Sequence, residues 1–183
     1  MNSSIKLLLL TLFICYVIGG VSACGEKDHP KDEQLIQNFQ NNKEEFNQLV
    51  QMFLEDKSLG RVASDFTRTS NFFEKCEEPN SWSGKEIEVT AERLAKYRKI
   101  FNNLGLSAGI EGYCEKNRVF LHASTKGLSV TGSTKGYAYL KKAPENPDKL
   151  VDNLDNYWSP DGKSFRAFRH IEGNWYLYFD YED

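Results

Sequence analysis

Two apolar segments near the end of the sequence, Phe165-Arg-Ala-Phe-Arg-His-Ile171 and Trp175-Tyr-Leu-Tyr-Phe-Asp-Tyr181, flank Glu172-Gly-Asn174. Each flanking segment is rich in aromatic and branched residues, and its apolar positions recur with a period of two, as is typical of β-strands. The glycine and asparagine between them tolerate the positive φ that a tight turn demands. The stretch therefore predicts a long antiparallel hairpin at the C-terminal end of the chain.

Alternation gives this hairpin two faces. One face carries the apolar set that we expect to point into the core: Phe165, Ala167, Ile171, Trp175, Leu177 and Phe179. The other face carries Arg166, Phe168, His170, Tyr176, Tyr178 and Asp180. Tyr and Arg are enriched at binding hot spots, so this second set is a candidate binding face. The alternatives are cross-strand pairing on an exposed face without a ligand, or burial beneath a loop from residues 142 to 163.

The sequence predicts further strands before the hairpin. Val119, Leu121 and Ala123 alternate with their neighbours, and Tyr137 and Tyr139 do the same. Each of these runs is preceded or followed by Ser-Thr-Lys-Gly, at 124–127 and 133–136. We interpret the two copies as turn segments of a meander. The alternative is that Lys126 and Lys135 are presented to an anionic partner.

The N-terminal half has the sequence pattern of α-helices. Eight apolar residues between Leu35 and Leu54 fall on one face at a period near 3.6, interrupted at Asn42 and Lys43, which predicts a long helix ending near Asp56. A second helix begins at Thr90, whose hydroxyl caps the first turn, and stops at Gly105. Residues 58–88 are expected to be loop with one strand.

Together these elements predict an α+β fold, with two N-terminal helices packed on one face of a C-terminal antiparallel β-sheet, a meander ending in the long hairpin. We expect residues 32–183 to form a single domain, preceded by a signal peptide at 1–23 and a tether at 24–31.

The first 23 residues have the order of a secretory signal. Lys6 precedes an apolar run from Leu7 to Val21, and the small residues Ser22 and Ala23 follow. The run is short for a transmembrane helix, which needs roughly 20 apolar residues. An uncleaved anchor helix is the alternative.

The four residues Val21-Ser22-Ala23-Cys24 resemble the lipobox of bacterial lipoproteins, with valine at the position usually held by leucine. The resemblance implies that Cys24 is acylated and becomes the new N-terminus, so that the membrane is a partner through this lipid. Gly25 in place of aspartate implies sorting to the outer membrane, facing the periplasm. Ordinary cleavage after Ala23, without a lipid, is the alternative.

Composition limits the function. The net charge is −3, and the charges are dispersed along the chain, which argues against nucleic-acid binding because that function normally needs a basic stripe. The run Gly127-Leu-Ser-Val-Thr-Gly132-Ser-Thr134 nearly matches a phosphate-binding loop, but Ser133 replaces the essential lysine. We identify no cofactor motif and no metal-ligand spacing among His29, His122 and His170.

Two classes of function are consistent with these features. The first is a non-catalytic envelope module that binds a protein, a peptide or a small ligand through the aromatic face, with neutralisation of a rival's toxin as one case. The second is a periplasmic hydrolase whose acid–base site combines His122 or His170 with a neighbouring carboxylate.

We predict one disulfide, between Cys76 and Cys114. Cys15 leaves with the signal and Cys24 carries the lipid, so these two cysteines remain to pair in an oxidising compartment. Closing this loop stabilises the fold by up to about 4 kcal/mol through chain entropy. Thiol labelling of the denatured, unreduced exported protein should find neither cysteine reactive. Two reactive thiols per chain would refute the pairing.

Overall fold

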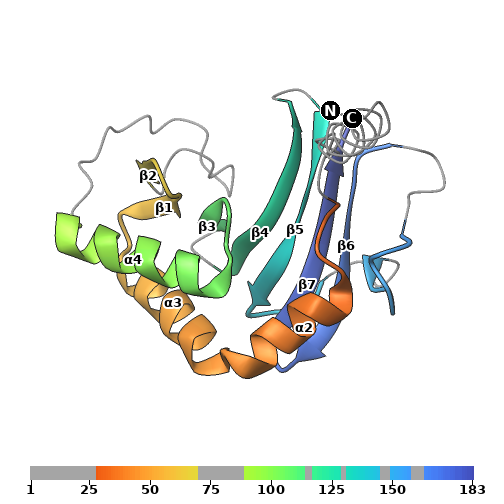
Figure 1. The fold of residues 1–183 in the computed structure, drawn as a ribbon, viewed down its shortest axis with the longest axis horizontal. Helices are drawn as coiled ribbons and strands as arrows, with labels where there is room; N and C mark the ends of the chain where they lie inside the picture. The colour runs from red at the N-terminus through yellow and green to blue at the C-terminus, as the bar shows by residue number, and fades with distance from the viewer. Residues whose placement is uncertain (1–27, 70–88, 114–116, 129–130, 145–148, 158–162) are drawn as a thin grey trace, which may run out of the picture.

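The computed structural model describes residues 28–69, 89–113, 117–128, 131–144, 149–157 and 163–183. Cys24, Cys76 and Cys114, and with them the lipidation and disulfide predictions, lie outside these ranges. The described part forms an α+β fold (Figure 1), as predicted. Its elements are α2 (Asp32–Asn41), α3 (Lys43–Glu55), β1 (Leu59–Val62), β2 (Thr67–Thr69), α4 (Ala91–Leu104), β3 (Gly109–Tyr113), β4 (Arg118–Leu128), β5 (Thr131–Leu140), β6 (Phe165–Glu172) and β7 (Trp175–Glu182).

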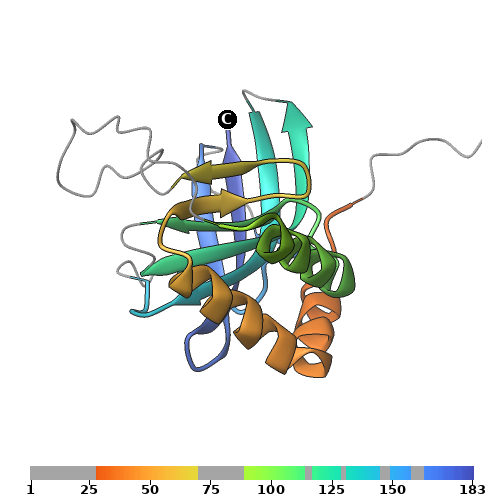
Figure 2. The ribbon, with the colours of Figure 1, turned by 90° about the vertical axis from the view of Figure 1, so that its left-hand side faces the viewer.

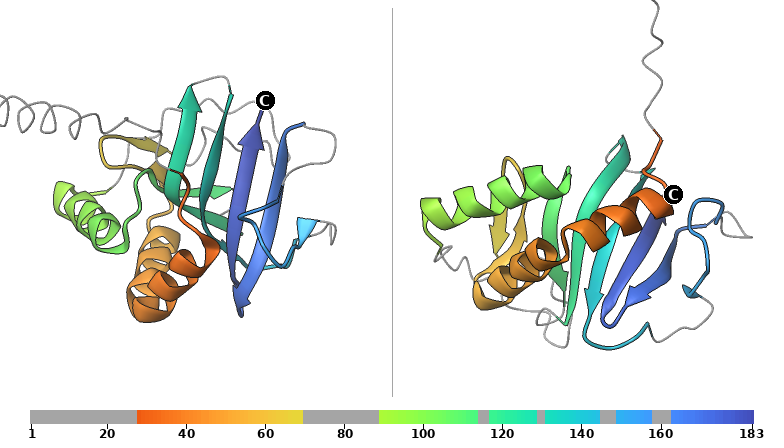
Figure 3. Two further views of the ribbon diagram at one scale, coloured as in Figure 1. Left: turned by 45° about the vertical axis from the view of Figure 1, so that its right-hand side comes forward. Right: turned by 60° about the horizontal axis from the view of Figure 1, so that its bottom comes forward.

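All strands join one antiparallel sheet in the order β2-β1-β3-β4-β5-β7-β6. The C-terminal hairpin of β6 and β7 is present, but the meander is not sequential, because β7 returns to pair with β5 and leaves β6 at the edge (Figure 3). The expectation of loop with one strand in 58–88 was also incomplete. Both β1 and β2 lie there, and at four and three residues they are too short to give a clear alternation.

The predicted long helix is two helices, and the break falls at Asn42, one of the two residues that interrupt its apolar pattern. Asn42 has φ −125° and ψ 22°, and its side-chain amide donates to the Asn38 carbonyl at 3.0 Å. The turn lets α2 and α3 follow different parts of the curved sheet (Figure 1). As a result Phe39 and Phe46 both lie against Trp175, with ring centroids 5.1 and 5.9 Å away.

Helix α4 begins and ends as predicted. The Thr90 hydroxyl accepts from the Arg93 backbone N–H at 3.1 Å, and Gly105 takes the left-handed conformation at φ 67°. Side chains join this helix to the end of α3: the Arg93 guanidinium and the Tyr97 hydroxyl both donate to Asp56, at 2.9 and 2.7 Å. No helix in the described ranges is long and apolar enough to cross a membrane.

The three helices cover the same face of the sheet (Figures 2 and 3), and the main core lies between the two layers. Its buried members come from every helix and from six strands. The alternation predicted for the hairpin is correct on this face: Ala167, Trp175 and Leu177 are in the core, and Phe165, Ile171 and Phe179 pack against it.

A buried group of charges fixes the start of α2 to the sheet. Asp32 is fully buried, and its carboxylate lies 2.7 Å from the Lys135 ammonium on β5 and 3.1 Å from the Arg169 guanidinium on β6. It also accepts from the Leu154 backbone N–H at 2.8 Å. Lys135 contacts Asp155 as well, at 2.6 Å. The alternative that Lys135 is presented to a partner is therefore wrong, since this side chain is inside the protein.

We predict that Asp32→Ala lowers the free energy of unfolding by about 3 kcal/mol, because it leaves a buried ammonium with one of its two carboxylates. Urea denaturation of the variant and the wild type measures the difference. The matched control is Glu33→Ala, which removes a mostly exposed carboxylate that pairs with Arg169 and should cost less than about 1 kcal/mol. Equal losses in both variants would contradict the role assigned to Asp32.

Candidate functional site

The predicted binding face lies on the side of the sheet away from the helices, as alternation requires. Register places its members side by side across the hairpin: Arg166 opposite Asp180, Phe168 opposite Tyr178, and His170 opposite Tyr176. Arg166 forms an ion pair with Asp180, and its guanidinium lies 4.7 Å from the centroid of the Phe120 ring. The sequence therefore predicted which residues share this face.

Most of this candidate binding face is covered. Phe168, Tyr176 and Tyr178 are 7%, 7% and 1% exposed, and they form a second apolar cluster with Phe120, Ala138 and Leu140. Arg166 and Asp180 are partly buried, and of the six only His170 is exposed. The three aromatic residues are thus buried, and the cover that the sequence suggested, a loop from residues 142 to 163, lies partly outside the described residues.

Next to this cluster, four polar side chains form a hydrogen-bonded row that the sequence did not predict. The Tyr178 hydroxyl lies 2.5 Å from Nδ1 of His122, and Nε2 of His122 lies 3.3 Å from the Glu111 carboxylate. Arg61 extends the row by donating to Glu111 at 3.3 Å. Strands β1, β3, β4 and β7 each contribute one residue, so only the sheet register brings the four together.

Gly136 on β5 makes the meeting of His122 and Tyr178 possible. It is the direct cross-strand partner of both residues and stands between them without a side chain. A Cβ atom at this position would lie 2.0 Å from the Leu121 carbonyl oxygen. Glycine inside a strand marks a close backbone approach, so Gly136 was the sequence signal that could have located this row of polar side chains.

The electrostatics favour a neutral imidazole. Burial lowers the pKa of His122 below its ordinary value of 6.5, and the hydrogen bond to Glu111 only partly opposes this effect. Both ring nitrogens already have protein partners. The arrangement holds a histidine, a tyrosine and a carboxylate in one hydrogen-bonded line, with Tyr178 inside the protein.

The other histidines lie elsewhere. His170 is exposed, and its Nε2 lies 3.1 Å from the Gly173 carbonyl oxygen. His29, assigned to the tether by sequence, instead contacts two serines of the sheet, Ser124 at 3.0 Å and Ser133 at 2.7 Å. In the ranges that the structure describes, no three His, Cys, Asp or Glu residues are grouped so that they could hold a metal ion.

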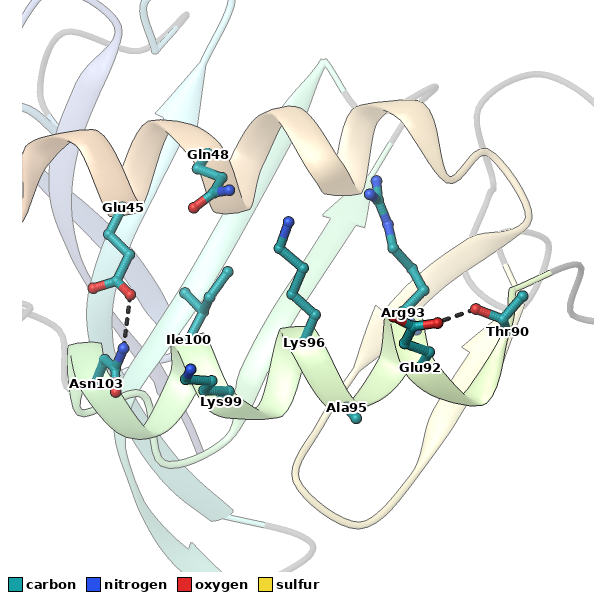
Figure 4. Close-up of a pocket in the computed structure, with 10 residues that line it drawn as sticks. All are labelled: Glu45, Gln48, Thr90, Glu92, Arg93, Ala95, Lys96, Lys99, Ile100 and Asn103. Carbon is teal, nitrogen blue, oxygen red and sulfur yellow. Dashed lines mark hydrogen bonds between the residues drawn. The ribbon is translucent and has the colours of Figure 1, made fainter.

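A groove open to solvent lies between α3 and α4 (Figure 4), and sequence reasoning did not find it. Its volume is about 790 Å³, and its lining residues are Glu45, Gln48, Thr90, Glu92, Arg93, Ala95, Lys96, Lys99, Ile100 and Asn103. Glu45 accepts from Asn103 across one end at 2.8 Å. Lys96 extends from α4 toward α3 in the middle of the groove, beside the buried Ile100.

Comparison with known proteins gives no relative: no family model, no curated protein and no solved structure matches the chain.

We predict that His122 makes stability depend on pH. Because its pKa is lowered by folding, the unfolded state binds the proton first, so stability is full above pH 6.5 and falls as pH decreases below 6.5. The slope reaches at most about 1.36 kcal/mol per pH unit for one group. His122→Gln should flatten the dependence of the unfolding free energy between pH 7 and 5, roughly the range in which histidine titrates.

His170→Gln is the control, since it removes an exposed histidine and should leave the slope unchanged. An equally steep slope in the wild type and His122→Gln would show that His122 is not the group responsible.

Proposed function

We propose that the protein is a lipid-anchored protein of the bacterial cell envelope whose domain is a non-catalytic binding module for a peptide, a protein or a small ligand. The anchor is supported by the apolar run ending in Val21-Ser22-Ala23-Cys24. Outer-membrane sorting with the domain in the periplasm follows the same resemblance. Neutralisation of a protein toxin is one form that such binding takes.

The observation that carries the binding proposal is the groove between α3 and α4. A volume of about 790 Å³ falls in the range of small-molecule and peptide sites. Its polar side chains lie in order along the groove, with Glu45 and Asn103 at one end, Gln48 and the lysines 96 and 99 in the middle, and Arg93 at the other end (Figure 4). An extended polar ligand would meet these groups in this order.

Charge indicates the kind of ligand. Arg93 is committed to Asp56 and Glu55, at 2.9 and 3.0 Å. Lys96 and Lys99 are exposed, and no carboxylate pairs with them among the residues that the structure describes. They stand three residues apart, on neighbouring positions of one helix surface. Their ammonium groups would attract the carboxylates of an acidic peptide or a small organic acid.

The binding test is an NMR titration of the protein with an acetylated tetraglutamate peptide. We expect the backbone amide signals of α4 to shift. We expect Lys96→Gln with Lys99→Gln to weaken binding about two- to thirtyfold, because each exposed ion pair contributes roughly 0.2–1 kcal/mol. The matched control, Lys141→Gln with Lys142→Gln, removes the same charge at two exposed sites outside the groove. Equal weakening in both pairs would mean that net charge, and not the groove, attracts the peptide.

We predict that Cys24→Ala moves the protein from the membrane fraction to the soluble fraction or leaves it unprocessed, since only the thiol accepts the lipid. Metabolic labelling with palmitate should mark the wild type and not the variant. Equal labelling of both would contradict acylation at Cys24.

A second candidate, a periplasmic hydrolase, has one observation in its favour. His122 has the carboxylate neighbour that an acid–base pair needs, Glu111, at 3.3 Å. Against it, both ring nitrogens of His122 are engaged and Tyr178 is buried. This candidate requires that purified wild-type protein hydrolyse a chromogenic ester, and that His122→Gln remove the activity.

A further inference from the structure

Residues 28–32 lie along the sheet, although the sequence places most of them in a tether. Asp28 lies 3.6 Å from Lys126, and His29 contacts Ser124 and Ser133 with its two ring nitrogens. The His29 ring also meets the edge of Phe179, with centroids 5.5 Å apart. The segment leads from the start of α2 along the strands toward the end of the sheet where the C-terminus lies (Figure 1).

The repeated Ser-Thr-Lys explains why this segment fits. Strands β4 and β5 are antiparallel, with Ser124 opposite Lys135 and Lys126 opposite Ser133. The four side chains thus form a square on the helix-covered face, with the serines on one diagonal and the lysines on the other. His29 bridges the two serines, while Asp28 faces one lysine and Asp32 pairs with the other.

We infer that residues 28–32 are a strap that fixes the orientation of the domain on the membrane, an inference that rests on the proposed lipid at Cys24. Asp28 is four positions after Cys24, and four steps of fully extended chain span at most about 14 Å. If residues 28–31 were not docked, the tether from Cys24 to Asp32 would span about 28 Å. This span is close to the length of a ten-residue strand, roughly 33 Å, so it would not fix which end of the sheet lies near the membrane. The docked strap therefore holds one end of the sheet at the bilayer.

The end held at the membrane is the one where β4 stops, β5 starts and β7 finishes. The opposite end carries the turn between β6 and β7 and the junction between α2 and α3 (Figure 1), which the ion pair of Lys43 with Glu172 joins. This second end points away from the lipid. The exposed residues Lys163, Glu182 and Asp183 lie at the membrane-facing end, which therefore presents charges of both signs.

Fluorescence quenching on vesicles tests the inference. The full-length lipidated protein is purified with a fluorescent amino acid in place of either Thr131, at the start of β5, or Gln40, near the end of α2; both positions are exposed. It is reconstituted into phosphatidylcholine vesicles that contain a lipid with a spin-labelled headgroup. We expect stronger quenching at 131 than at 40, because Thr131 is at the start of β5, at the membrane-facing end, and Gln40 is near the junction of α2 and α3 at the opposite end (Figure 1). Anionic lipid should not change the ratio.

The strap itself is tested by Ser124→Ala with Ser133→Ala, which removes the two hydroxyls that contact the ring nitrogens of His29, and by His29→Ala as a second route. Either change should bring the ratio toward one. The matched control is Thr125→Ala with Thr134→Ala, an adjacent cross-strand pair on the other face of the same strands, which should keep the wild-type ratio.

The results distinguish failure of the strap from failure of the lipid anchor. Protein that floats with the vesicles but shows equal quenching at both positions overturns the strap and leaves the lipid anchor standing. An unchanged ratio in the serine and histidine variants overturns it too. Protein that carries no acyl label and does not float overturns the proposed anchor, and the orientation with it.

Discussion

The buried carboxylate of Asp32 joins the first turn of α2 to the sheet. Removing a charge from water costs several kcal/mol, and the fold recovers this cost only because an ammonium, a guanidinium and a backbone amide all converge on one side chain. These partners come from β5, β6 and the segment at 149–157. One residue at the first turn of α2 thereby sets where the helix layer begins and where the edge of the sheet is covered.

The segment at 149–157 covers part of the edge of β6 and contacts this strand directly. Leu150 forms a parallel bridge with Phe168, and the Val151 backbone N–H donates to the Phe168 carbonyl at 2.8 Å. Because Asp32 accepts from Leu154 and Asp155 accepts from the Asp32 backbone, the covering segment is tied to the helix as well as to β6. An edge strand with unpaired amides is a template for association with other chains, and here part of it is occupied from within.

The sequence predicted the features that depend only on residues close together in the chain. Alternation assigned the two faces of β6 and β7 correctly, and Thr90 and Gly105 marked both ends of α4, because each signal resides in neighbouring residues. The division at Asn42 was visible as an interruption, but a pattern of apolar positions does not say whether an interruption bends a helix or ends it. Alternation also separates two faces without saying whether each is covered, so the burial of Tyr176 and Tyr178 could not be deduced.

Features that depend on long-range register could not be predicted. The line from Arg61 through Glu111 and His122 to Tyr178 requires the strand order and the gap at Gly136. The groove requires the angle at which α4 crosses α3, and that angle follows from how side chains pack between the helices and the sheet.

The position of β7 has a consequence for how the protein is made. The last strand in the chain is an interior strand of the sheet, paired with β5 on one side and β6 on the other. A chain that still lacks β7 therefore cannot join β6 to the remaining strands, and Phe39 and Phe46 lack their contact with Trp175. The complete sheet can therefore form only after β7 has been synthesised. Export as an unfolded chain, which we propose for this protein, is compatible with this order, because the sheet stays incomplete until β7 is available.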